Sequence, residues 1–574
     1  MLRRTIRTTI LLAYPLALVP PARAQENVLY DNANIYTMNP DRPRAGQMLV
    51  SEGTIIAVGS EAEIAAAAQE VGIRVYRRID LAGRTVIPGL IDAHGHLVNL
   101  GLIELGMLDL RTCRSYEEVI ALVRARAATE PPGTWIVGRG WDNESWPDRA
   151  MPTHGALSES VPDHPVWLRR VDGHAGLANS AAMRAAGLSE GAPDPPGGEI
   201  LRAEDGSPTG VFVDNAEDLI ASHVASARAG TQELLLAAQA ACLRAGLTGV
   251  HDAGVSPEDV DAYLRLEADG RLKLRIYAML HAKDAPTYFE GHPKYDGWKL
   301  TVRAAKAYVD GAMGSRGAWL LDPYADRPRD DQGQPYAGLA TGSVRDLETL
   351  VAHALANEYQ VCTHAIGDRA NREVLDAYER ALAGFESASE RTDMFENGRF
   401  SPRFRVEHAQ LLSAQDIPRF AALGVIASMQ PTHCTSDMRW VEARVGETRA
   451  AGAYAWASLA RTGATLAFGS DFPVEAHSPF AGLYAAITRR DQTGQPAGGW
   501  RPEQCLTREE ALRAFTLGAA RAAFWETRTG SLDPDKLADF LVLDRDVMTI
   551  DAGLIPDTGV VMSVIAGEVV YRAP

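Results

Sequence analysis

Residues 86–96 read VIPGLIDAHGH, a short apolar run that ends in two histidines, His94 and His96, separated by one glycine. A run of this length, bounded by turn-forming and polar residues, is typical of a buried β-strand. Side chains at positions i and i+2 of a strand point to the same face, so both imidazoles can reach one cation. The stretch predicts a strand that ends in two metal ligands, although such a pair also occurs without a metal.

Seven further apolar runs follow, and helical patterns lie between several of them. The eight expected strands cover residues 86–92, 247–252, 274–280, 302–310, 360–365, 404–408, 425–430 and 465–470. Capping signals, in which a Ser or Thr is followed three residues later by an acid, predict helix starts after Ser115, Ser256 and Thr507. Alternating strands and helices imply parallel pairing. The pattern predicts an α/β fold, a (β/α)8 TIM barrel over residues 86–528.

The two ends of the mature chain are expected to form one small β domain together. Residues 28–59 alternate apolar and polar side chains around a turn at Gly53, and residues 540–571 contain three more short β patterns. Neither end has enough strands for a stable sheet of its own. Residues 25–85 and 529–574 are therefore predicted to build a composite β-sandwich.

The interval between the first two barrel strands is too long for a single helix. Residues 100–240, approximately, contain stretches rich in Trp, Gly and Pro, such as GRGWDNESWP at 138–147. Loops at the carboxyl ends of barrel strands carry binding functions. We expect this segment to be an insertion that lies over the barrel mouth.

Composition excludes several classes of protein. The 574 residues are 46% hydrophobic and 23% charged, which is typical of a folded globular protein and not of a disordered chain. The net charge of −17 argues against a nucleic-acid partner, because binding a polyanion requires clustered positive charge. The five scattered cysteines contain no C-x-x-C pair, so no disulfide framework is expected. Only six of the 57 basic residues are lysines, which makes a lysine within a strand informative.

The N-terminus has the pattern of a signal peptide. Basic residues at 3, 4 and 7 precede an apolar stretch at 10–19 and an A-x-A cleavage site at 22–24. Removal of residues 1–24, which contain four arginines and no acid, gives a net charge of −21. The pattern predicts a periplasmic or secreted protein with no membrane anchor after cleavage. Arg3-Arg4 partly matches a twin-arginine signal, so the export route stays open.

Three more candidate ligands, His364, His408 and Asp471, stand at the ends of expected strands. Each is ambiguous alone, because a strand-end histidine is often simply packed and an Asp before Pro473 is often a turn former. The carboxyl ends of all strands in a (β/α)8 barrel meet at one rim. Four histidines and one aspartate at that rim match the ligands of a divalent metal ion, with zinc the expected one.

With these motifs in place, the chain resembles the metal-dependent amidohydrolase superfamily, and within it the amidohydrolase 3 group, which includes N-substituted formamide deformylases. The shared motifs extend over essentially the whole mature chain. They are PGLIDAHGH at 88–96, RRVDGHA at 169–175, NS at 179–180, KAYVDGAMGS at 306–315, HAIGDRAN at 364–371, EHAQ at 407–410, GSDFP at 469–473 and GSLDPDKLAD at 530–539.

The resemblance implies a metal centre with Asp471 as both ligand and proton-transfer base. The implied metal ligands are His94, His96, Lys306, His364, His408 and Asp471. Lys306 matches a lysine that many members carboxylate with CO₂ to bridge two metals, a reaction that requires a neutral amine and therefore a depressed pKa. A lysine that merely extends its charge to solvent is the alternative. One metal or two, and the carboxylation itself, stay open.

The implied activity is hydrolysis of a non-peptide amide bond in a small molecule, by attack of metal-activated hydroxide with Asp471 as proton shuttle. His174 is either a catalytic hydrogen-bond donor or a structural residue. Trp141, Arg170 and Arg316 are candidates for substrate binding. Two alternatives remain: an ester, lactone or cyclic-imide hydrolase with the same site, and a non-catalytic periplasmic binding protein. The oligomeric state, including a homodimer, is left open.

Overall fold

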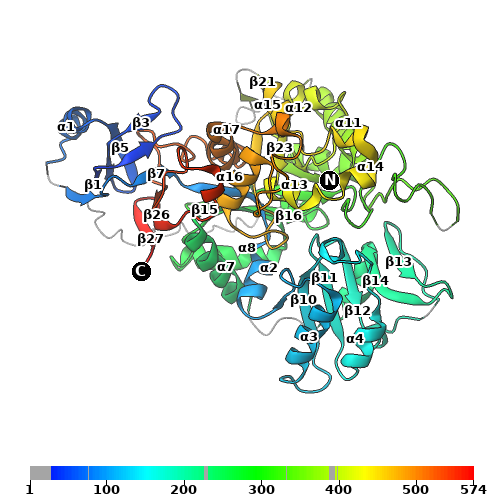
Figure 1. Ribbon diagram of the computed structural model, residues 1–574. Helices are drawn as coiled ribbons and strands as arrows, with labels where there is room; N and C mark the ends of the chain where they lie inside the picture. The colour runs from blue at the N-terminus through cyan, green and yellow to red at the C-terminus, as the bar shows by residue number, and fades with distance from the viewer. Residues whose placement is uncertain are drawn as a thin grey trace, which may run out of the picture.

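The computed structural model describes residues 27–74, 76–189, 191–224, 230–330, 332–386, 395–396 and 399–574. Three parts are distinguishable along the chain: a β-sandwich, a barrel and a lobe formed by the insertion (Figure 1). The expected signal peptide, residues 1–24, lies outside the described residues. Within the described ranges, no helix has the length and apolar content that crossing a membrane requires.

The sandwich consists of two sheets, and both chain ends contribute to it, as predicted. The first sheet has the order β5-β4-β1-β6 and the second β27-β26-β25-β7-β2-β3. The strands are β1 (Val28–Asp31), β2 (Asn34–Tyr36), β3 (Arg44–Ala45), β4 (Gln47–Ser51), β5 (Thr54–Gly59), β6 (Arg77–Asp80), β7 (Thr85–Pro88), β25 (Phe540–Leu543), β26 (Val560–Ile565) and β27 (Glu568–Arg572). The helix α1 (Glu61–Glu70) covers the first sheet, where Ile64 is buried against Leu29 and Leu49.

The two ends of the chain are joined by direct strand pairing and by a common core. β25 pairs antiparallel with β7, placing Leu541 opposite Ile87. The ring of Tyr30 from β1 meets that of Phe540 from β25 edge-on, with 4.8 Å between centroids. Each end thus supplies the apolar surface that the other needs for burial.

The barrel has the eight predicted strands, all parallel, and an added hairpin strand β17 (Tyr295–Asp296). Their order is β24-β23-β22-β19-β18-β16-β15-β8. Their bounds are β8 (Leu90–Gly95), β15 (Leu247–Val255), β16 (Arg275–His281), β18 (Leu300–Tyr308), β19 (Gln360–Ala365), β22 (Arg405–His408), β23 (Ile426–Met429) and β24 (Leu466–Phe468). A parallel bridge between Gly95 and Phe472 brings the first and last strands together, so the TIM barrel is confirmed.

The first predicted strand, 86–92, is in fact two strands that belong to different sheets. Gly89 separates β7, which lies in the sandwich, from β8, which lies in the barrel. A side chain at Gly89 would meet Thr248 Oγ1 at 2.2 Å, so only glycine fits at this crossing. The boundary expected between residues 85 and 86 therefore falls inside β7.

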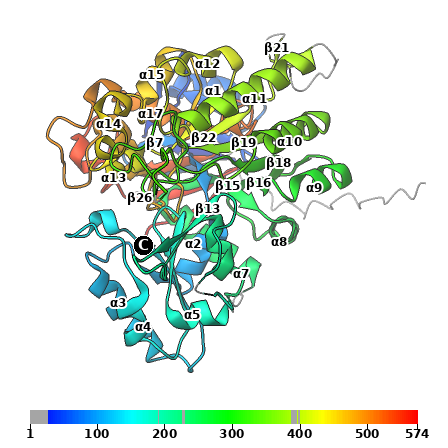
Figure 2. The ribbon, with the colours of Figure 1, turned by 90° about the vertical axis from the view of Figure 1, so that its right-hand side faces the viewer.

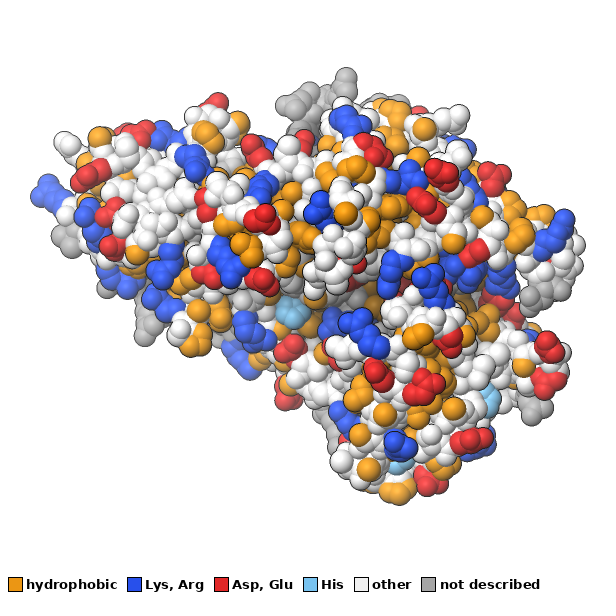
Figure 3. Space-filling view, in the orientation of Figure 1, with side chains coloured by type: hydrophobic (Ala, Val, Ile, Leu, Met, Phe, Trp, Pro, Cys, Tyr) orange, Lys and Arg blue, Asp and Glu red, His pale blue; other side chains and the backbone are white. Residues whose placement is uncertain are grey.

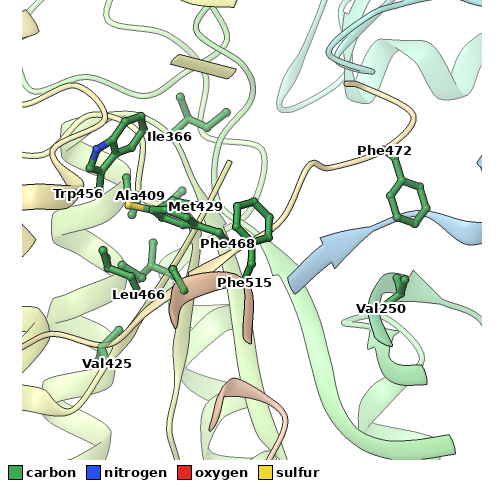
Figure 4. Packing of buried hydrophobic residues seen from close by; sticks show 14 of the residues in the cluster. Val250, Ile366, Ala409, Val425, Met429, Trp456, Leu466, Phe468, Phe472 and Phe515 are labelled. Carbon is green, nitrogen blue, oxygen red and sulfur yellow. The ribbon is translucent and has the colours of Figure 1, made fainter. Parts of the chain in front are cut away.

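Helices lie around the barrel, and the three capping predictions are confirmed. Ser115, Ser256 and Thr507 each accept a hydrogen bond at the start of a helix. The α-helices of the barrel are α2 (Leu97–Glu104), α7 (Thr231–Ala245), α8 (Pro257–Ala268), α9 (Ala285–Gly291), α10 (Val344–Ala356), α11 (Asp368–Glu386), α12 (Ile417–Leu423), α13 (Pro431–Asp437), α14 (Val441–Ala450), α15 (Trp456–Arg461), α16 (Pro479–Thr488), α17 (Arg508–Arg513) and α18 (Ala519–Ala522). Between strands and helices lies an apolar core that includes Met429, Trp456, Phe468 and Phe515 (Figure 4).

The insertion folds around its own six-stranded sheet and forms a lobe beside the barrel (Figure 2). The sheet order is β13-β14-β12-β11-β10-β9. Its elements are β9 (Leu108–Asp109), α3 (Tyr116–Ala127), β10 (Ile136–Trp141), α4 (His154–Ser160), β11 (Val166–Arg170), β12 (Ala175–Ala178), α5 (Ser180–Ala185), β13 (Gly198–Arg202), β14 (Pro208–Asp214) and α6 (Asp218–Ala221). A separate apolar cluster holds the lobe together.

Candidate metal centre

The predicted ligands converge at the carboxyl ends of the barrel strands. His94 lies at the end of β8, and His96 follows that strand directly. His364 lies near the end of β19, and His408 is the last residue of β22. Asp471 lies three residues after β24. The barrel geometry thus brings residues almost 400 positions apart in the sequence to one rim.

Two groups of side chains at this rim have metal-binding geometry, and they share Asp471. In the first group, Asp471 Oδ1 lies 3.0 Å from His96 Nε2 and 3.8 Å from His94 Nε2. In the second, Asp471 Oδ2 lies 3.8 Å from His433 Nε2, and His408 is the third member. The ligand atoms within each group lie within 4.8 Å of one another. Imidazole and carboxylate groups at such spacing suit zinc and similar divalent ions.

The close approach of Asp471 to the H-x-H pair depends on Gly95. A Cβ atom at this position would lie 2.5 Å from the ring of Phe472, which faces β8 (Figure 4). A second link comes from Asp92, which accepts hydrogen bonds from the Ser470 hydroxyl at 2.6 Å and its backbone N–H at 3.0 Å. These contacts hold the first and last barrel strands together directly beneath the candidate metal ligands.

His364 and Lys306 complete the set of predicted ligands. The rings of His364 and His408 lie 4.5 Å apart by their centroids, and those of His408 and His94 lie 4.9 Å apart. The Lys306 amine is buried 3.1 Å from His94 Nε2. His408 is oriented by Gln430, whose Oε1 lies 2.8 Å from His408 Nδ1. All six predicted ligands are thus neighbours in one cluster.

The protonation states at this site favour metal binding. Burial lowers the pKa of His94 to about 4 and holds those of His364 and His408 well below the usual value, which leaves neutral imidazoles. Burial also lowers the pKa of Lys306 to about 8. His364 Nε2 is buried and makes no hydrogen bond within the described part of the chain. The nearest carboxylate oxygen to that nitrogen is Asp310 Oδ1 at 3.5 Å. Neutral imidazoles and a carboxylate fit a divalent cation.

The orientation of His94 rests on a buried ion pair beneath it. His94 Nδ1 lies 2.5 Å from Glu407 Oε2, and Glu407 Oε1 lies 2.7 Å from Arg405 Nε. Burial opposes the charge of Glu407, but Arg405, His94 and Lys306 together outweigh burial and lower the pKa of this carboxyl below its usual value. The carboxylate therefore stays ionised and fixes the ring of a metal ligand.

Replacing Glu407 with Gln is expected to lower the free energy of unfolding by about 3–5 kcal/mol, because Arg405 would remain buried without its counter-charge. Urea titration of the purified variant measures the loss. Glu509→Gln, at an exposed position in α17, is the matched control. A loss of less than about 1 kcal/mol in Glu407→Gln would show that the pair carries no more than a surface ion pair does.

His433 is a member of the cluster that the sequence analysis did not identify. It lies in the first turn of α13, just after β23, and its ring is parallel to that of His408 at a centroid distance of 6.0 Å. Its Nε2 is buried and has no hydrogen-bond partner among the described residues. The only sequence signal was its position shortly after the seventh barrel strand, where loops reach the rim.

A cavity of about 520 Å³ opens in front of the metal ligands, between the barrel and the insertion lobe. The barrel contributes His364, His408 and Asp471, and the lobe contributes Arg170 and His174. The face of the molecule drawn in Figure 3 carries both acidic and basic side chains, interspersed with each other. The cavity has the volume of a typical small-molecule site.

His174 lies in this cavity and is the residue that the lobe presents to the metal cluster. Its ring lies 5.0 Å from that of His364, and its Nδ1 lies 2.7 Å from Asp214 Oδ1. Burial opposes a charge here, but Asp214 and Asp172 outweigh it and raise the pKa of His174. His174 therefore keeps its proton to a higher pH than the neighbouring histidines, whose pKa values are lowered.

The three predicted substrate-binding residues have different positions. Arg170 lines the cavity, yet its guanidinium is already bound to Asp142 at 3.1 Å and to Asp172. Trp141 is buried in the core of the lobe, where its indole N–H donates to Leu168 O at 2.7 Å. Arg316 does not line the cavity and pairs with Asp326 at 2.9 Å. Of the three residues, only Arg170 lines the cavity. Substrate contact stays a prediction for all three.

Comparison with known proteins agrees with this geometry. A model of the "Amidohydrolase family" matches residues 77–571. Protein LONG AFTER FAR-RED 3 of Arabidopsis thaliana is 33% identical, over 92% of this chain and 89% of its own length. The N-substituted formamide deformylase of Arthrobacter pascens is 28% identical, over 94% of this chain and 97% of its own.

Among solved structures, an uncharacterized metal-dependent hydrolase from Pyrococcus horikoshii has the same fold. It superposes with a TM-score of 0.72 and 27% sequence identity, and the match covers 92% of this chain and 99% of that one. The likeness therefore extends over barrel, sandwich and insertion together.

Proposed function

The chain belongs to the amidohydrolase family, and on this premise we propose that it is an exported enzyme that hydrolyses the acyl–nitrogen bond of a small-molecule amide. Family membership confirms the resemblance seen in the motifs and makes the protein a metal-dependent hydrolase that acts on carbon–nitrogen bonds. An N-acyl or N-formyl amine is the proposed substrate class. The observation that carries the proposal is the pair of metal-binding groups that share Asp471 at one wall of the cavity.

The proposed cofactor is zinc, held by His94, His96, His364, His408 and Asp471, with Lys306 as a further ligand if it is carboxylated. A divalent cation there supplies Lewis acidity, which activates water and polarises the substrate carbonyl. The lowered pKa of Lys306 supports carboxylation, because only the neutral amine reacts with CO₂. Whether one ion or two are held depends on that modification.

Proton transfer is assigned to residues on opposite sides of the substrate. Burial would raise the pKa of Asp471, but the interactions with His96, His94 and His408 together outweigh burial and keep the carboxylate ionised. Asp471 can therefore accept the proton of the attacking water and return it to the leaving nitrogen. His174, on the lobe, is placed to donate a hydrogen bond to the carbonyl oxygen or the leaving group.

The proposal is tested by metal analysis and chelation. Purified protein is expected to contain about one or two divalent ions per chain, and dialysis against a chelator should abolish amide hydrolysis until zinc is restored. Protein that is purified without metal, and that acquires no activity when zinc is added, would favour the alternative of a non-catalytic binding protein.

The rival reaction at the same site is hydrolysis of an ester, lactone or cyclic imide. Matched amide and ester substrates with the same acyl group separate the two. If kcat/KM is higher on the ester after correction for the intrinsic reactivity of the two bonds, the amide assignment is wrong although the metal site stands.

His174→Gln is expected to lower kcat by about 10²-fold, because a charged donor is replaced by a neutral one. The raised pKa means that His174 is protonated at low pH and loses its proton as pH rises through the raised value. Wild-type kcat should therefore decline on the alkaline side, and this limb should be absent from the variant. An unchanged pH profile would identify His174 as structural. His164→Gln, within the lobe but outside the cavity, is the control.

A further inference from the structure

A second, much smaller cavity lies at the opposite end of the barrel from the metal centre. It has a volume of about 10 Å³ and lies where β18 begins, next to the segment that leads into the sandwich. Three cationic residues line it, Arg275, Lys299 and Arg528, together with Trp298 and Trp525. This volume corresponds to one water molecule or one ion of similar size.

Lys299 is a buried lysine whose amine has no hydrogen-bond partner among the described residues. The residue is only 7% exposed. An ammonium group loses several kcal/mol of hydration on burial, so buried lysines are normally paired. A lysine that lines a cavity and lacks a protein partner indicates a partner of another kind.

The carboxylates around the cavity are engaged by groups other than the Lys299 amine. Arg275 binds Asp539 through two hydrogen bonds of 2.5 and 2.9 Å, and Arg528 binds Asp296 at 3.0 Å. Nearby, Lys273 and Glu568 form a further ion pair, with 2.9 Å between Nζ and Oε1. A fourth carboxylate, Glu267, accepts the backbone N–H groups of Lys299 at 2.5 Å and Leu300 at 3.0 Å and the hydroxyl of Tyr295 at 2.7 Å. None of these carboxylates forms a hydrogen bond with Lys299 Nζ.

We propose that this cavity binds one small monovalent anion, such as chloride, which pairs with Lys299 between the guanidinium groups of Arg275 and Arg528. The anion would supply the hydrogen-bond partner that the buried Lys299 amine lacks. It would also join the base of the barrel to the sandwich, because Asp539 lies immediately before β25 and β18 begins at the neighbouring residue, Leu300. Burial, followed by the charge of Arg275, lowers the pKa of Lys299 to about 7 when only protein groups surround it. Bound anion would oppose that shift and keep the amine protonated.

Thermal unfolding of the full chain tests the site. Chloride is varied from about 5 to about 200 mM, with gluconate, which is too large for the cavity, holding ionic strength constant. Wild-type Tm is expected to rise by about 2–4 °C in a saturable manner. In Lys299→Met the chloride-specific rise should vanish. Lys283→Met, which removes one lysine from an exposed position after β16, should keep it.

Diffraction from wild-type crystals grown in bromide gives a second measurement that does not depend on any variant folding. An anomalous peak within hydrogen-bond distance of Lys299 Nζ supports the proposal. A water molecule or an empty cavity there, or equal chloride dependence of Tm in wild type and Lys299→Met, overturns it. The outcome is independent of the metal centre, so either proposal can fail alone.

Discussion

Replacing His94 and His96 together with alanine is expected to lower amide hydrolysis by about 10³-fold or more, with loss of the bound metal. His96 Nε2 lies 3.0 Å from Asp471 Oδ1 and His94 lies between Asp471 and Glu407, so the exchange leaves Asp471 as the only remaining member of the first metal-binding group. The ion of that group is the one expected to be lost, because one carboxylate does not hold zinc against water at neutral pH. The second group, His408, His433 and Asp471, keeps its three ligands. Metal content by elemental analysis and kcat/KM are measured on the same preparation.

The matched control is His223→Ala with His292→Ala, which removes two exposed histidines away from the cavity. It should retain metal and activity. Because His94 is buried, its loss also leaves a space and an unpaired Glu407 oxygen, so circular dichroism of both variants is compared first. A folded His94/His96 variant with wild-type activity would refute the metal-dependent reaction at this site.

Much of the architecture follows from local patterns in the sequence. The buried strands are short, apolar and bounded by turns, and the helices begin at Ser115, Ser256 and Thr507 with side-chain caps, so the signals are contained within a few residues. The division of the first predicted strand, 86–92, into β7 and β8 does not follow from a local pattern. It depends on Gly89 crossing Thr248 and on its N–H donating to Asp539 O at 2.9 Å, and these contacts join residues far apart in the sequence.

The candidate site also has features that local sequence predicts and features that only tertiary structure sets. Ligands that end a strand are predictable, because strand ends in a barrel share one rim. His433 was not predictable, because it reaches the rim from the first turn of a helix. Trp141 shows a second limit: an aromatic residue in a Gly- and Pro-rich segment resembles a pocket residue, and the sequence does not show that its indole N–H is satisfied by Leu168 and that its ring is buried. Side-chain partners of this kind are set by tertiary packing.

Asp471→Asn is expected to lower kcat by about 10²–10⁴-fold, the usual contribution of a general base. The amide keeps nearly the same shape but cannot accept the proton of the attacking water. Burial opposes ionisation of Asp471, but the surrounding histidines together hold its pKa well below the usual value, so the carboxylate stays ionised through the neutral and mildly acidic range. Activity that depends on the ionised Asp471 carboxylate is therefore present above the lowered pKa. It is lost only when the pH falls through that pKa.

Two roles of Asp471 must be separated, because the same carboxylate is a proposed metal ligand and a proposed base. Rates are therefore expressed per bound metal ion, and zinc affinity is measured by chelator competition. If Asp471→Asn lowers only the zinc affinity, and its rate per bound ion equals that of the wild type, Asp471 is a ligand and another group moves the proton. If the rate per ion falls by about 10² or more, the base role stands. Asp544→Asn, exposed on the sandwich, should change neither quantity.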